Sequence, residues 1–243
     1  MTDAATTPAD APSRLRLTDL TILLDRSGSM KARRAVAMSG FNDLLVEQRT
    51  LPDRARLTLT QFDHLYEPGA VGKRLRNVPL LDESTYVPRG MTALLDAIGR
   101  TIKDTEQRLE KRAAKRARNG KPAEDVDVVI TVITDGLENA SSFFSHEDIK
   151  AMIEAKEAED DWTFTFMGTT WESVRQSERF GMKAAFSVEM GERPEDYAEA
   201  KRMMSRKFRT VRERTAFHAG SVKDAMRFTE EERAQLGQKS NPQ

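Results

Sequence analysis

The sequence of 243 residues contains no cysteine. This absence excludes disulfides, thiolate metal ligands and cysteine nucleophiles. Histidine is nearly as scarce, and none of His64, His146 and His218 has a partner at ligand spacing, so no histidine is expected to be catalytic. No stretch approaches the roughly 20 apolar residues that a membrane span needs, and residues 1–16 lack the apolar core of a signal peptide. We therefore expect a cytoplasmic protein with no membrane partner.

An excess of charge of one sign is also missing. Lys and Arg together number 39, as do Asp and Glu, so the formal net charge is zero. No global field therefore favours nucleic acid. Residues 111–121 are basic and contain no acid, but aromatic residues are not interleaved with them as in many nucleic-acid sites. A solvated helix extension is the better interpretation of this segment, and no nucleic-acid partner is expected.

Apolar runs and turn residues alternate along the chain as they do in α/β proteins. Residues 17–24 and 128–134 end in nearly continuous apolar runs, which are typical of central parallel strands buried on both faces. Further strands are expected at 56–62, 162–167 and 184–188, with an edge strand at 77–81 because Pro79 excludes a central one. Amphipathic segments between them predict helices. The fold class is therefore α/β: a doubly wound, mostly parallel sheet with helices on both faces.

The expected organisation is one folded domain with appendages. Residues 1–16, rich in Ala, Thr, Pro and Asp, are expected to be a disordered leader, and residues 17–190 the domain. A helix within 191–220 should pack on or beside the domain, and 221–243 should be a mostly flexible tail with one short helix at 229–236. Capping boxes are expected at Ser145 with Asp148 and at Thr169 with Glu172.

Polar side chains gather in three loops that follow or precede these core elements. Asp25, Ser27 and Ser29 come directly after the first apolar strand, and Asp135 comes directly after the other. Thr92 lies in a loop just ahead of a long helix. In open α/β sheets, ligands bind in the crevice beyond the carboxyl ends of the strands. Two carboxylates and three hydroxyls should therefore converge if the two strands are neighbours.

These candidate ligands are all oxygen atoms, with no His or Cys beside them. Such a set selects Mg²⁺, Mn²⁺ or Ca²⁺ rather than Zn²⁺. The two carboxylates would also repel each other without a cation between them. The sequence therefore predicts a divalent-metal site, with Mg²⁺ as the first choice.

The same residues resemble a known family. The segment Leu-Leu-Asp25-Arg-Ser27-Gly-Ser29-Met resembles the Asp-x-Ser-x-Ser motif of von Willebrand factor A (vWA) domains, the first part of their metal-ion-dependent adhesion site. Thr92 matches that family's lone threonine, and Asp135 in Ile-Thr-Asp-Gly matches its third-loop aspartate. The likeness spans residues 17–188 and is greatest to small stand-alone domains of bacteria and their phages. It implies that Asp25, Ser27, Ser29, Thr92 and Asp135 hold the metal, directly or through water, and that an acidic residue of a partner protein completes its coordination.

Each neighbouring residue also has a plainer interpretation. Thr92 could simply cap its helix. A turn role is favoured for Asp63, and Glu138 and Asn139 are expected at the rim of the cleft rather than as ligands. Arg26 and Arg89 are expected to be solvated, the alternative being contact with an acidic partner.

Three functions fit the predicted metal site. The leading one is a non-enzymatic binding module whose metal bridges to an Asp or Glu of a partner protein. The first alternative is a phosphotransferase resembling the haloacid dehalogenases, with Asp25 as nucleophile. That family needs a second Asp two residues later as general acid, and this chain has Ser27 there. The second alternative is a scaffold subunit with a purely structural metal.

Overall fold

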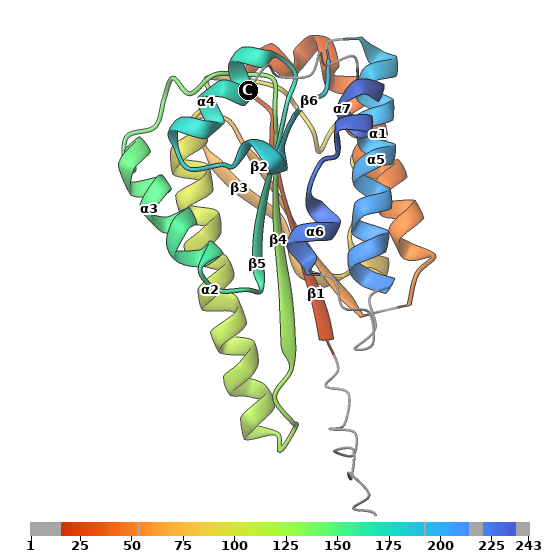
Figure 1. Cartoon of the computed structure of the whole chain (residues 1–243), viewed down its shortest axis with the longest axis vertical. Coiled ribbons are helices and arrows are strands. Elements are labelled where there is room, and N and C mark those ends of the chain that lie inside the picture. Colours follow the sequence, from red (N-terminus) through yellow and green to blue (C-terminus); the bar gives the residue numbers. More distant parts are fainter. Residues whose placement is uncertain (1–15, 53, 192, 214–220, 237–243) are drawn as a thin grey trace, which may run out of the picture.

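A six-stranded sheet forms the centre of the computed structural model, which describes residues 16–52, 54–191, 193–213 and 221–236. The strands run in the order β3-β2-β1-β4-β5-β6, and all neighbours are parallel except β2 and β3 (Figure 1). Their bounds are β1 Arg16–Asp25, β2 Ala55–Phe62, β3 Tyr66–Arg74, β4 Asp125–Thr134, β5 Trp162–Gly168 and β6 Ser187–Glu189. The expected doubly wound α/β fold is confirmed.

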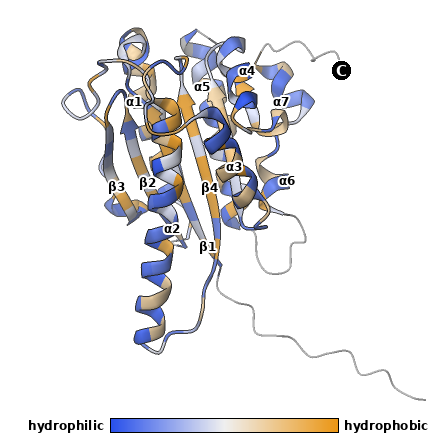
Figure 2. Cartoon of the chain, turned by 90° about the vertical axis from the view of Figure 1, so that its left-hand side faces the viewer, coloured by the Kyte–Doolittle hydropathy of each residue, from blue (hydrophilic) through white to orange (hydrophobic). Residues whose placement is uncertain are grey.

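Helices cover both faces of this sheet (Figure 1). On one face lie α2 (Leu94–Arg118), α3 (His146–Glu157) and α4 (Trp171–Arg179). On the other lie α1 (Arg34–Arg49), α5 (Pro194–Glu213), α6 (Val222–Met226) and α7 (Glu230–Gln235). The central strands β1 and β4 are buried on both faces, which explains their long apolar runs (Figure 2).

The second half of α2 extends past the sheet, where its residues are mostly hydrophilic and exposed (Figure 2). Arg112 and Arg116 pair with Glu124 in the connection that returns to β4. The basic segment 111–121 thus forms the end of a solvated helix and its turn, as expected.

The antiparallel edge strand lies at a different place from the one predicted. Residues 77–81 are not a strand; β3 is formed by Tyr66–Arg74 instead. That segment contains Pro68 and two glycines, and nearly all of its residues are partly or fully exposed, so it shows no apolar alternation. Val78 and Leu81 are buried in the core beside α1, which explains their apolar character without a strand.

Two further features lie at positions slightly different from those predicted. The Ser145–Asp148 capping box is present at α3, but the α4 box is formed by Thr170 and Ser173 rather than Thr169 and Glu172. The final strand begins at Ser187, because residues 184–186 form a 3₁₀ turn.

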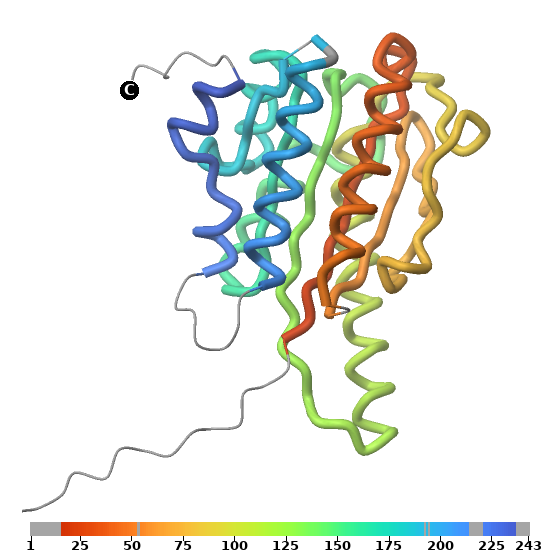
Figure 3. The backbone as a smooth tube through the Cα atoms, turned by 90° about the vertical axis from the view of Figure 1, so that its right-hand side faces the viewer, coloured from red at the N-terminus to blue at the C-terminus, as the bar shows by residue number. Residues whose placement is uncertain are grey.

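The C-terminal segment packs onto the domain through more of its length than predicted. In α5, Tyr197, Met204, Phe208 and Val211 are buried as expected, and Figure 3 shows α5 beside α1. Residues 221–236 differ from the expected flexible tail. The short helix predicted at 229–236 is present as α7, whereas α6 was not predicted. Both helices, together with the residues that follow them, bury apolar side chains in the same core: Val222, Met226, Phe228 and Leu236. Their apolar residues are too few for a periodic pattern, which is why the sequence did not show this packing. Residues 1–15 and 237–243, expected to be leader and tail, lie outside the described residues.

No helix within the described residues combines the length and apolar character needed to cross a membrane.

Lys201 of α5 is a charged side chain held against α1. Its Nζ donates a hydrogen bond to the carbonyl of Val36, and a Cβ atom at Gly40 would lie 1.6 Å from Lys201 Cδ, so a side chain there would displace the end of Lys201. Burial lowers the pKa of Lys201 to about 8, and the negative charge of Asp43 only partly offsets this. Below pH 8 the folded protein must therefore keep a partly buried cation.

We expect Lys201→Met to raise the free energy of unfolding at pH 7 by about 1 kcal/mol. Because the folded pKa lies below the unfolded value, the cost of Lys201 is fully present below pH 8 and fades as the pH rises towards about 10.4. The variant's advantage in urea unfolding should therefore shrink across that window. Arg206→Met, at an exposed residue of the same helix that also pairs with Glu199, is the control. An advantage independent of pH would contradict this assignment.

Candidate metal centre

The carboxyl ends of β1 and β4 bring the two predicted aspartates together. The strands are parallel neighbours, with Leu24 level with Ile133, so Asp25 ends one strand and Asp135 follows the other. Asp25 is fully buried, and Thr134 Oγ1 donates to its Oδ2 at 2.5 Å. The expectation that the two apolar strands are central neighbours is confirmed.

The two serines lie in the turn that leaves β1. Ser27 N–H donates to Asp25 Oδ1 at 2.6 Å, which folds the chain back over the end of the strand. Ser27 Oγ lies 3.0 Å from Ser29 Oγ, and Ser29 Oγ donates to Asp135 Oδ1 at 2.6 Å. These contacts join both aspartates and both serines in one cluster.

Gly28, between the serines, approaches the loop that carries Thr92. Its N–H donates to the carbonyl of Gly90 at 3.1 Å, and a Cβ atom at Gly28 would lie 3.2 Å from that same oxygen. Gly90 itself has a φ of +68°, which favours glycine. The two glycines let these two loops meet.

Thr92 faces the cluster rather than capping a helix. The N-cap residue of α2 is Ala93, without a side-chain cap, so the capping interpretation of Thr92 is wrong. A Cβ atom built on Gly136 would lie 2.9 Å from Thr92 Oγ1 and 3.5 Å from Asp25 Oδ2. Thr92 therefore lies beside Asp25, and the structure brings all five predicted residues together at this end of the sheet.

Glu138 and Asn139 hold the loop after β4 against the start of α2. Asn139 exchanges two hydrogen bonds with the backbone of Thr92, at 2.8 and 3.0 Å. Glu138 Oε2 accepts from the Leu95 N–H at 2.9 Å. These side chains lie at the rim, as expected, and they also position Thr92 and Asp135.

Arg26 and Arg89 both pair with the buried carboxylate of Asp63, although the Arg89 side chain itself is 45% exposed. Both Nε atoms donate to Asp63 Oδ2 at 3.0 Å, and both guanidinium groups also contact Glu67. Asp63 is fully buried and Arg26 is 5% exposed. The solvated role expected for Arg26 is therefore wrong. Asp63 is more than a turn residue, because it joins two arginines from the loops that carry Ser27 and Thr92.

Two contacts were not identified from the sequence. Tyr86, fully buried, donates from its hydroxyl to the carbonyl of Asp25 at 2.6 Å. Arg33 Nη1 donates to Asp135 Oδ2 at 2.9 Å. Arg33 belongs to the basic run Lys-Ala-Arg-Arg, in which no local pattern distinguishes it from its neighbours.

The electrostatics of the cleft favour a cation. Burial raises the pKa of Asp25 to about 7, and the negative charge of Asp135 adds to this, while hydrogen bonds from Thr134 and Ser27 oppose it. Two neighbouring carboxylates, one of them buried, repel each other when both are ionised. A positive ion between them stabilises the ionised forms.

The oxygen atoms also fit such an ion. Within the described ranges there is no group of three or more His, Cys, Asp or Glu that could hold a metal, so any site here depends on hydroxyl oxygens. Neighbouring ligands of octahedral Mg²⁺ at about 2.1 Å lie about 3.0 Å apart. The Ser27–Ser29 and Ser29–Asp135 oxygen separations, 3.0 and 2.6 Å, are close to that spacing.

Solved structures with the same architecture include vWA proteins. A von Willebrand factor type A protein from Catenulispora acidiphila is 16% identical with a TM-score of 0.51, matching 79% of this chain and 42% of its own. The ArnB paralog VWA2 from Sulfolobus acidocaldarius is 14% identical with a TM-score of 0.52, matching 80% and 46%. Proximal thread matrix protein 1 from the mussel byssus is 15% identical with a TM-score of 0.53, matching 80% and 47%.

The chain therefore has the fold of vWA domains, and at these identities the likeness concerns the fold alone. It spans less than half the length of these structures. No protein-family model and no curated protein matches the sequence.

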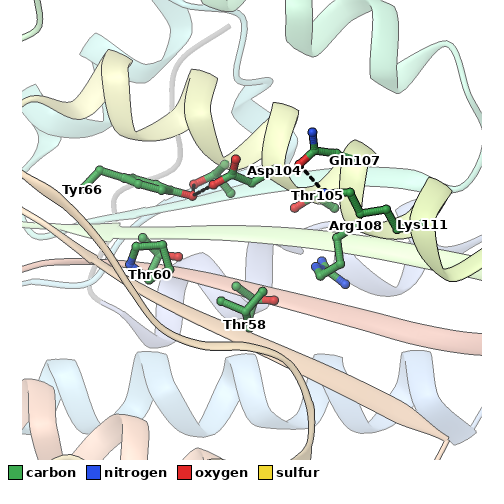
Figure 4. A pocket seen from close by; sticks show the side chains of 11 residues that line it. Thr58, Thr60, Tyr66, Asp104, Thr105, Gln107, Arg108 and Lys111 are labelled. Atoms are coloured by element: carbon green, nitrogen blue, oxygen red, sulfur yellow. Dashed lines mark hydrogen bonds between the residues drawn. The ribbon is translucent and has the colours of Figure 1, made fainter.

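A second polar feature lies between α2 and the antiparallel edge of the sheet. A pocket of about 310 Å³ is lined by hydroxyl groups of β2, β3 and α2 (Figure 4). Beside it, Arg108 reaches from α2 to the sheet and donates to both carboxylate oxygens of Asp19, at 2.5 and 2.8 Å. This pocket shares no lining residue with the five candidate metal ligands.

Proposed function

We propose that this chain is a metal-dependent protein-binding module. A divalent ion, Mg²⁺ by preference, is held by Asp25, Ser27, Ser29, Thr92 and Asp135, and it takes an Asp or Glu of a partner protein as a further ligand. The observation that carries the proposal is the convergence of two carboxylates and three hydroxyls at the end of β1 and β4.

The position of the cluster supports an outside ligand. Ser29 is exposed, whereas Asp25, Ser27 and Thr92 are buried, so the cluster opens to solvent on one side only. An octahedral ion keeps coordination positions for water or another oxygen. A carboxylate bound to a divalent cation is held far more strongly than one in a surface ion pair. The proposed setting is the cytoplasm, with a protein as partner.

Added Mg²⁺ or Mn²⁺ should raise the melting temperature, and the gain should grow with ion concentration because only the folded state binds. Asp25→Ala and Asp135→Ala should each abolish that gain, as measured by thermal unfolding with added metal and with EDTA. Asp160→Ala, at a fully exposed carboxylate, is the control and should respond as the wild type does. If both cleft variants keep the gain, the metal binds elsewhere.

Partner binding requires its own measurement. A pulldown from source-cell lysate should retain the partner with Mg²⁺ and lose it with EDTA or with Asp25→Ala. Ser27→Ala and Thr92→Ala should weaken it through the metal. Metal-dependent hydrolysis of p-nitrophenyl phosphate that disappears in Asp25→Asn would instead favour the phosphotransferase. If Mg²⁺ stabilises the domain but EDTA does not release the partner, the metal has a purely structural role.

A further inference from the structure

A groove beside the metal cleft combines apolar and basic side chains. It has a volume of about 390 Å³ and is lined by Leu137, Trp171, Glu172, Arg175, Gln176 and Arg179. We propose that this groove is a second contact for the partner and binds an acidic segment that carries a bulky apolar side chain. This proposal rests on the proposed function, because the same partner would give a carboxylate to the metal.

The groove adjoins the loop that carries the candidate ligand Asp135. Leu137 follows the candidate ligand Asp135 by two residues. The N–H of Glu138 donates to Gln176 Oε1 at 2.8 Å, which fastens the metal loop to α4. A peptide with its carboxylate on the metal would therefore continue directly over this groove.

Its two large apolar side chains are exposed to solvent. Trp171 is 44% exposed and Leu137 is 38% exposed, whereas the other tryptophan, Trp162, is only 3% exposed. Tryptophan is enriched among residues that dominate the energy of protein interfaces. Burying these two side chains against an apolar side chain of a partner would remove their apolar surface from water.

The charges of the groove fit an acidic partner. Arg175 and Arg179 are one helical turn apart and therefore lie on the same side of α4, and both are exposed. Neither forms an ion pair with any part of the chain that the structure describes. Glu172 is the single acidic residue of the lining, so the groove is positive overall, and a bound metal would add to that charge. Acidic groups near these arginines would gain attraction without breaking an existing pair.

The test uses fluorescein-labelled synthetic peptides in which an Asp is followed, after a Gly-Ser spacer of varied length, by a Leu and a pair of Glu. With Mg²⁺ present, anisotropy should show binding to the wild type. The double substitution Arg175→Glu and Arg179→Glu should weaken it about tenfold, and Trp171→Ala by a similar factor. Neither change should reduce the Mg²⁺-dependent gain in melting temperature. Arg202→Glu, an exposed arginine on α5 on the other side of the sheet, should bind as the wild type does.

Labelling with 5-fluorotryptophan adds a readout of position. The peptide should move the fluorine resonance of Trp171, while that of buried Trp162 stays in place as an internal reference. Two outcomes would overturn the groove proposal but not the metal site. One is Mg²⁺-dependent peptide binding that the groove substitutions do not change. The other is a domain that Mg²⁺ stabilises but that binds no peptide. Peptide binding that the groove substitutions remove but EDTA does not would support the groove and overturn the metal-bridged function.

Discussion

Arg108→Met should lower the free energy of unfolding by about 3–5 kcal/mol, the usual cost of leaving one partner of a buried ion pair without the other. Asp19 is fully buried in β1, and Arg108 donates to both of its carboxylate oxygens. The Asp19 side chain is only 1% exposed and the Arg108 side chain 18%, so Arg108→Met leaves a buried carboxylate without its cation. Equilibrium unfolding in urea measures the loss.

The matched control is Arg112→Met, one turn further along α2. Arg112 pairs with Glu124, but both side chains are more exposed than Asp19, at 29% and 13%, so the loss should stay within about 1 kcal/mol. Replacing both Arg108 and Asp19 by apolar residues should recover much of the stability, because no buried charge then remains. Equal losses for Arg108→Met and Arg112→Met would show that the Asp19 pair contributes no more than a surface pair.

Arg33→Gln should tighten Mg²⁺ binding by about tenfold, which corresponds to about 1.4 kcal/mol. The guanidinium of Arg33 lies 2.9 Å from Asp135 Oδ2, so an incoming cation must share that carboxylate with an existing positive charge. Loss of the charge removes the repulsion and frees the oxygen. Without metal, the same variant should be less stable than the wild type, because Asp135 then lies beside Asp25 with less compensation.

Isothermal titration calorimetry with MgCl₂ measures the affinity, and thermal unfolding in EDTA measures the metal-free stability. Lys31→Gln is the control, since it removes an exposed positive charge from the same turn without touching Asp135. An unchanged or weaker affinity in Arg33→Gln would show that Arg33 mainly orients Asp135 for the metal. In that case the melting temperature should gain less from Mg²⁺ than the wild type gains.

The interactions that surround the predicted ligands were harder to infer than the ligands themselves. Arg26 and Asp63 are 37 positions apart, and Arg33 and Asp135 are 102 apart. The local sequence around a charged loop residue is the same whether that residue is solvated or buried against a distant partner. The exposed strand β3 and the short helix α6 were missed for a related reason, because each has too few apolar residues to show a period.

The sequence by itself determined the α/β class, the central position of β1 and β4, and the five residues that converge beyond their ends. Continuous apolar runs mark strands covered on both faces, and polar turns directly after them must lie at one edge of a parallel sheet. Thr92, which precedes a helix, was placed with them by its resemblance to the vWA motif. The tertiary structure alone decided which basic side chain pairs with Asp135, that Arg26 pairs with Asp63 beside the candidate site, and that Leu137 and Trp171 share a groove. These contacts join residues far apart in the chain, and their energies depend on burial and distance, which exist only once the sheet and its helices have packed.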